Sequence, residues 1–181
     1  MAFKFFKGLF SGSRGASHKG AETMPPEHHA VDREPTIFVY SDEMSWFDFG
    51  ADHPFKPERA AKTYDLCTRY GVMNHPWMKI LEPAALPINL LSLFHEPRYL
   101  LLLQEAREDK LTPDMIAHGL GTLDNPIISG IYEWSLLAAG GTLGAMDCLV
   151  KKEAEAAFNP LGGFHHAMPD HAEGFLSLIH I

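Results

Sequence analysis

Two adjacent histidines near the end of the chain are the residues best suited to chemistry. His165 and His166 follow a Gly-Gly-Phe stretch within "LGGFHHAMPDHAEGF" (161–175). Histidine titrates near neutral pH, so a buried pair can hold one proton donor and one proton acceptor side by side. A Gly-Gly turn lets the backbone approach a substrate closely while both imidazoles project into one cavity. The pattern favours acid–base catalysis, in which the pair activates a water and protonates a leaving amine.

Metal binding is the rival chemistry for these histidines. Imidazole nitrogen is a common zinc ligand, and Asp170 and His171 add two more candidate ligands. Pro169 interrupts any helix that would align His166 with Asp170, so the spacing matches no compact helical zinc motif. A structural or incidental role is the third alternative. Residue types and spacing rank acid–base catalysis first of the three and leave the other two open.

The elements that must position the pair alternate between strands and helices. The segment "TIFVY" (36–40) is typical of a strand, and "AEAAFNP" (154–160) predicts a buried strand that ends at Asn159 and Pro160. The histidine loop would then follow a strand end, where ligand sites form in open α/β sheets. Helices are predicted from Pro57 to just before Gly71, at 87–94, 97–108 and 112–120, and from about Ile131 to Lys151.

Small residues are concentrated in the last of these helices. Its stretch "AAGGTLGA" (138–145) weakens helix propensity but permits close approach to a neighbouring element. We therefore expect this helix to lie against a sheet or a second helix. Together the elements predict an α/β fold.

Composition narrows the class of protein. Of the 181 residues, 46% are hydrophobic and 21% charged, as in soluble globular proteins. A net charge of −8 argues against a broad phosphate-binding surface, so no direct nucleic-acid binding is expected. No apolar run is long enough to span a bilayer. Two cysteines do not make a disulfide framework, and a reducing, cytoplasmic location is predicted.

Residues 1–35 differ from the rest of the chain. Residues 1–20 carry four basic side chains and no acidic one, and 12–35 are rich in Ser, Gly, Pro, Glu and His. We predict a flexible basic leader and linker here, with the ordered domain beginning at residue 36. The alternative is a short membrane-surface helix, because "MAFKFFKGLF" places Phe3, Phe6, Leu9 and Phe10 on one helical face.

The histidine segment also carries a family resemblance. "FNPLGGFHHAMPDHAEGF" closely resembles the signature of the zinc-dependent histone deacetylase superfamily, which includes acetoin-utilisation and acetylpolyamine amidohydrolase branches. Three upstream segments resemble the family in the same order, so the resemblance covers 36–175. It implies an arginase-like fold with a central parallel sheet flanked by helices. The three segments are "HPFKPERAAKTYDLC", "LFHEPRYLLLL" and "GTLDNPIISGIYEWSLLAAGGTL".

The resemblance implies a reaction as well as a fold. Members of this family hydrolyse acetyl-lysine or similar acetylated amines, with a zinc ion polarising the acetyl carbonyl and its bound water. His165 matches the first histidine of the family pair, which supplies electrostatic stabilisation. His166 matches the second, which acts as general base and then as general acid. The implied partner is an acetylated lysine in a protein or an acetylated small amine.

Four further residues match positions of the family's substrate site. Asp124 corresponds to the rim aspartate that grips the substrate backbone, and Gly174 and Phe175 to the pair lining the acyl-lysine tunnel. Arg59 corresponds to an arginine of the channel through which acetate leaves. Three of them have a plainer alternative. Asp124, which precedes Asn-Pro, is also a good turn residue. Arg59 could be an exposed charge in the first turn of a helix, and Phe175 could be a core residue.

The last six residues, "LSLIHI" (176–181), depart from the resemblance. The family's metal ligands and its polarising tyrosine follow the Gly-Phe motif, and none is expected within this chain. The six residues also read as a translation of a transposon-end adapter, so we predict a non-native tail. Residues 36–175 are then the N-terminal part of a catalytic domain, inactive by itself. The alternatives are a non-catalytic acyl-lysine or polyamine binding protein and a small metal- or membrane-binding protein.

Overall fold

The protein is described by a computed structural model. Every residue that the structure describes belongs to one compact unit, within residues 32–181. The predicted tail and residues 1–33 of the predicted leader and linker lie outside the described residues. The structure describes residues 34–106, 110–162 and 166–174.

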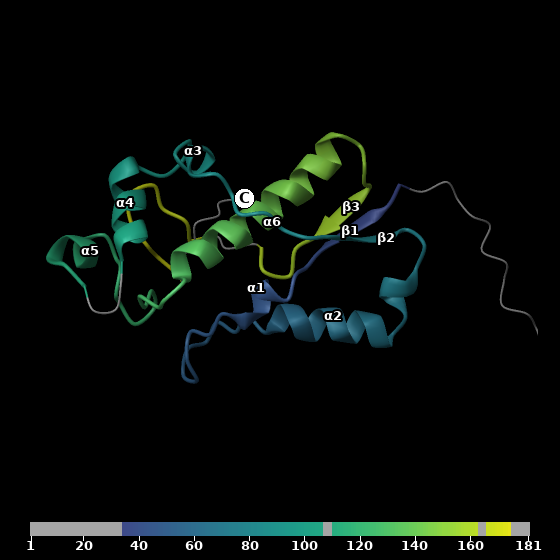
Figure 1. The fold of residues 1–181 in the computed structure, drawn as a ribbon, viewed down its shortest axis with the longest axis horizontal. Coiled ribbons are helices and arrows are strands. Elements are labelled where there is room, and N and C mark those ends of the chain that lie inside the picture. Colours follow the sequence, from purple (N-terminus) through teal and green to yellow (C-terminus); the bar gives the residue numbers. More distant parts are fainter. Residues whose placement is uncertain (1–33, 107–109, 163–165, 175–181) are drawn as a thin grey trace, which may run out of the picture. The chain divides into compact units, whose positions relative to one another are not determined.

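In the described part of the chain, three short strands form one parallel sheet in the order β2-β1-β3 (Figure 1). The central strand β1 (Thr36–Val39) pairs along its whole length with β2 (Met78–Leu81) on one side. On the other side it pairs with β3 (Ala156–Phe158). Because all three strands run in one direction and helices connect them, the predicted α/β class with a parallel sheet is confirmed.

The helices form largely where local sequence signals place them. Gly71, which follows α2, adopts a left-handed φ of 74°, the conformation that ends many helices. The predicted helices at 87–94 and 112–120 are each reduced to a single turn or little more. The helices are α1 (Glu43–Trp46), α2 (Arg59–Arg69), the 3-10 turn η1 (Val72–Asn74), α3 (Ile88–Leu91), α4 (Pro97–Glu105), α5 (Pro113–Ala117) and α6 (Ile131–Val150).

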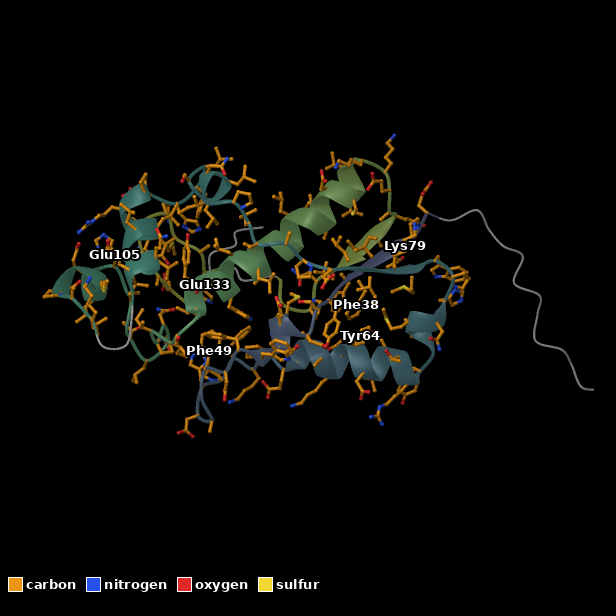
Figure 2. All side chains as sticks on the ribbon, viewed as in Figure 1. Phe38, Phe49, Tyr64, Lys79, Glu105 and Glu133 are labelled. Atoms are coloured by element: carbon orange, nitrogen blue, oxygen red, sulfur yellow. The ribbon has the colours of Figure 1, made fainter. Side chains whose placement is uncertain are left out.

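Side chains of β1 alternate between the two faces of the sheet. Val39 lies against α6, since a Cβ added at Gly141 would be 2.9 Å from its Cγ1. Phe38 points the other way, and its ring centroid is 6.0 Å from that of Tyr64 on α2. Figure 2 shows Phe38 and Tyr64 beside each other between the strand and this helix. The sheet is thus covered by α6 on one face and by α2 on the other.

One expectation about strands needs correction, and one strand was not predicted. The strand at 156–158 was predicted to be buried, but Phe158 is 51% exposed. Among the described residues this strand lies at an edge of the sheet and pairs only with β1, so its outer side has no neighbour. β2 was missed, because "MKIL" is short and has no alternating pattern. This segment becomes a strand because it pairs with β1, and its own sequence does not predict that pairing.

The small residues of α6 allow the close approach that the sequence predicted. A Cβ at Gly140 would collide with the carbonyl oxygen of Ala84. The same stretch is bonded to the helix, because the Leu86 amide donates to the Leu136 carbonyl at 2.9 Å. The segment that follows β2 therefore lies directly on α6. Within the described residues, no helix is long and apolar enough to cross a membrane.

Gly140→Ala is expected to lower the free energy of unfolding by about 1–3 kcal/mol, because a backbone oxygen cannot move aside as a side chain can. Gly144→Ala is the matched control within α6. Its new Cβ would lie 3.1 Å from Leu81 Cδ2, which can shift, and helix propensity improves by about 1 kcal/mol. Urea unfolding followed by circular dichroism would measure both variants. Equal midpoints for the two would contradict the packing described here.

Candidate active site

The loop that carries the histidine pair is fixed to α6 where it begins. Asn159, directly after β3, donates from Nδ2 to Thr142 Oγ1 on α6 at 2.9 Å. Its Oδ1 accepts from the amide of Leu161 at 3.1 Å, and Leu161 is fully buried. His165 lies outside the described residues, so its electrostatic role stays a prediction.

The segment 166–174 is attached to the rest of the domain through its backbone. Three hydrogen bonds tie it to the turn before α4 and to the turn after α5. His95 is 2% exposed and must carry its proton on Nδ1, because its partner is a carbonyl oxygen. The bonds run from the Glu96 amide to Pro169 O (2.7 Å), from His95 Nδ1 to Met168 O (2.9 Å) and from the Ala172 amide to His118 O (2.8 Å).

His166 and Gly174 lie against each other within this segment. Gly174 has a φ of 48°, and a Cβ built on it would collide with the His166 side chain. His166 is partly buried. The structure thus brings together two residues that the sequence assigned to different tasks, proton transfer and tunnel lining. The absence of a side chain at Gly174 leaves room for the imidazole. Phe175 lies outside the described residues.

Asp124 lies at an open cavity of about 810 Å³. Asp124 is exposed and lies in a turn where Thr122 Oγ1 accepts a hydrogen bond from the backbone amide of Asn125 at 3.1 Å. The predicted turn and the predicted rim position are therefore compatible. Two of the segments that line the cavity each carry an acidic residue, Asp52 in one and Asp124 in the other. The lining residues are 49–54, Leu111, 121–124, Pro126 and Ile127.

Two buried polar side chains that the sequence analysis did not single out connect this turn to its surroundings. His53 is 9% exposed, and its Nε2 lies 3.4 Å from the Asp124 carbonyl oxygen. Asn125 is 4% exposed, and its Nδ2 donates to Ala172 O at 3.4 Å. Asn125 thus joins the Asp124 turn to the segment that holds His166. Both residues lie inside quoted motifs, "HPFKPER" and "LDNP", but only their contacts show what they do.

Arg59 is the first residue of α2 and is exposed. Its guanidinium carbon lies 4.7 Å from the centre of the Phe55 ring, a cation–π contact. Partial burial against this neighbourhood lowers the pKa of Arg59 from its usual value, although an arginine stays charged at neutral pH. Within the described ranges no ion pair is formed by Arg59. Its role in acetate exit stays a prediction.

Tyr99 on α4 is the most enclosed titratable group of the region. The residue is 0% exposed, and burial raises its pKa well above the usual tyrosine value. Its hydroxyl has no hydrogen-bond partner among the residues that the structure describes. Its ring lies 5.7 Å from that of His95, which supports the 166–174 segment. Tyr99 therefore stays neutral and acts as part of the packing behind this segment.

Comparison of the sequence with known proteins identifies the family of the chain. The family model described as "Histone deacetylase domain" matches residues 53–178. The chain belongs to the histone deacetylase family. The acetoin utilization protein AcuC of Bacillus subtilis (strain 168) is 33% identical over 141 residues, 77% of this chain and 36% of AcuC. Histone deacetylase 9 of Arabidopsis thaliana is 35% identical over 147 residues, 79% of this chain and 34% of that protein.

Histone deacetylase HDAC1 of Drosophila melanogaster is also similar, with 31% identity over 146 residues, 79% of this chain and 27% of that protein. The chain thus spans about a third of the length of the curated relatives it matches. The part that matches the histone deacetylase domain begins at His53 and contains every site residue predicted above. The predicted family is therefore confirmed, whereas the individual residue roles stay predictions.

A ligand set for zinc was not expected in this part of the family sequence. In residues 34–106, 110–162 and 166–174, no group of three or more His, Cys, Asp or Glu side chains is arranged to hold a metal ion. Two of the described histidines have other partners. His95 bonds a carbonyl oxygen, and His171 Nδ1 lies 2.7 Å from Asp170 Oδ1 at the surface.

Proposed function

We propose that this segment supplies the proton-transfer histidines and the substrate rim of a zinc-dependent amidohydrolase. The enzyme would remove acetyl groups from acetyl-lysine or from a related acetylated amine. One observation carries the proposal most directly: the side-chain Nδ2 of Asn125 donates to Ala172 O, which joins the Asp124 turn to the segment of His166 and Gly174. The residue proposed to hold substrate and the residue proposed to move the proton therefore belong to one connected framework.

In the proposed reaction, the His166 imidazole accepts a proton from the attacking water and later donates it to the leaving amine. His165 beside it stabilises the charge that develops. Gly174 keeps the space next to the His166 ring free, and Phe175 lines the passage for the acyl-lysine stem. Asp124 accepts hydrogen bonds from backbone amides of a peptide substrate, and the cation of Arg59 favours departure of the acetate anion.

Zinc is part of the proposal because the chain belongs to the histone deacetylase family. The described residues offer no ligand group for it, so the proton-transfer steps are derived from the histidines alone. Family relatives are named for histones and for acetoin utilisation. The histone deacetylase names fit an acetylated amine, and we propose that class without choosing between protein and small-molecule substrates. A cytoplasmic location is proposed with it.

The test uses the protein expressed from its complete natural gene. Acetate release would be followed from an acetyl-lysine peptide and from an N-acetylated diamine. Activity on at least one substrate is expected, with loss after treatment with a chelator and recovery on adding Zn²⁺. Peptide binding that needs no zinc and releases no acetate would support the non-catalytic acyl-lysine binding protein instead. A folded protein with neither binding nor turnover would contradict both.

A further inference from the structure

His53 lies where it can fix the backbone of the residue proposed to grip substrate. Its Nδ1 is 3.3 Å from the Phe55 amide nitrogen, which can only donate a hydrogen bond. Nδ1 must therefore be the acceptor, and the proton of the neutral imidazole lies on Nε2. That nitrogen is 3.4 Å from the carbonyl oxygen of Asp124, which can only accept. One tautomer of His53 thus satisfies both neighbours.

The His53 ring is itself held by aromatic neighbours. It stacks on Phe49 with ring centroids 4.7 Å apart and planes inclined by 17°. Phe49, labelled in Figure 2, makes edge contacts with Phe55 at 5.3 Å and with Trp134 of α6 at 5.8 Å. Trp134 is fixed in turn, because its Nε1 donates to Met44 O at 2.9 Å. The imidazole is therefore fixed to a rigid helix through buried rings.

The opposite side of the Asp124 turn is held by the next residue. Asn125 donates from Nδ2 to Thr122 Oγ1 at 3.2 Å and to Ala172 O at 3.4 Å. Its own carbonyl accepts from the Gly121 amide at 2.9 Å. The peptide unit between Asp124 and Asn125 is thus held through both its polar groups, because its N–H donates to Thr122 Oγ1 and its carbonyl oxygen faces His53 Nε2. The Asp124 side chain remains exposed.

We propose that His53 is a positioning residue that orients Asp124 toward substrate, with Asn125 closing the same turn and joining it to Ala172. This inference rests on the proposed function, in which Asp124 accepts hydrogen bonds from substrate backbone amides. A carboxylate on an exposed turn loses conformational freedom when it binds. A backbone already fixed by two buried side chains has less freedom to lose. His53 should therefore strengthen binding of peptide substrates, and it should not affect a small acetylated amine that has no backbone amides.

The test compares two variants of the complete natural protein. His53→Phe keeps a flat ring that can stack on Phe49 and removes both nitrogens. His53→Gln keeps an N–H donor near the position of Nε2. For an acetyl-lysine peptide, we expect His53→Phe to raise KM about three- to tenfold with kcat little changed, as expected for loss of one hydrogen bond. His53→Gln should restore much of the loss. The acetylated diamine should show no change with either variant.

A double-mutant cycle with Asp124→Ala separates positioning from general structural damage. If His53 acts through Asp124, adding His53→Phe to Asp124→Ala causes no further loss with the peptide. Independent, additive effects would overturn the proposal. An equal loss with peptide and diamine would also overturn it, because that result would mean a general effect on the fold or on the chemistry.

Hydrogen exchange distinguishes failure of this inference from failure of the proposed function. A folded wild-type protein without deacetylase activity would reject the function. Exchange of the backbone amides in 119–127 would still decide whether His53 fixes the turn. Faster exchange there in His53→Phe, with other segments unchanged, supports the positioning role. Unchanged exchange in 119–127 overturns it, whatever the activity.

Discussion

His166→Gln is expected to lower kcat for acetyl-lysine hydrolysis by about 10²–10⁴-fold, with a much smaller change in KM. Glutamine is similar in size and can form hydrogen bonds, but it cannot accept and return a proton at neutral pH. The expected factor is the usual contribution of a general acid–base group. Steady-state kinetics on the complete natural protein, with thermal melting to confirm folding, would provide the measurement.

His171→Gln is the matched control, because it changes the same residue type in the same segment. His171 lies at the surface beside Asp170, and its loss should change kcat by less than about twofold. This control also tests the metal-binding alternative for the histidine cluster. Equal large losses in both variants, accompanied by loss of bound metal, would favour that alternative. Unchanged kcat in His166→Gln would reject His166 as the proton-transfer residue.

Gly174→Ala is expected to reduce kcat by about 10–100-fold while the protein stays folded. The new Cβ would collide with the His166 ring, so the imidazole must move from its position. A displacement of about 1 Å of a reacting group can cost on the order of 10²-fold in rate. The left-handed backbone at this position adds strain of about 1–2 kcal/mol for a residue with a Cβ. Kinetics and urea unfolding would measure the two effects separately.

Gly71→Ala separates the backbone effect from the collision. Gly71 also has a left-handed φ, of 74°, but a Cβ there would have no atom within 4 Å. This variant should lose a similar amount of stability through strain and keep the wild-type kcat. If Gly174→Ala behaved like Gly71→Ala in the kinetic assay, the contact between Gly174 and His166 would not matter for catalysis.

The sequence by itself determined the elements whose signals are local. Gly71 stops α2 because it alone can take the left-handed backbone there without strain. The β-branched and aromatic residues of 36–39 form a strand as expected. The small residues of 138–145 lie where the sheet and the segment after β2 approach α6 closely. The order of four motifs also identified the family, because motif types and spacing are properties of the chain alone.

Tertiary structure alone decided which residues meet. β2 exists because β1 offers it a partner in register, and Phe158 of β3 is half exposed where, among the described residues, the strand pairs only with β1. The supports of the site follow the same rule. His53 meets Asp124 across 71 positions of the chain, and Asn125 meets Ala172 across 47. Local sequence patterns indicate which backbone conformation a short segment favours, whereas hydrogen bonds between distant segments depend on how the whole domain folds.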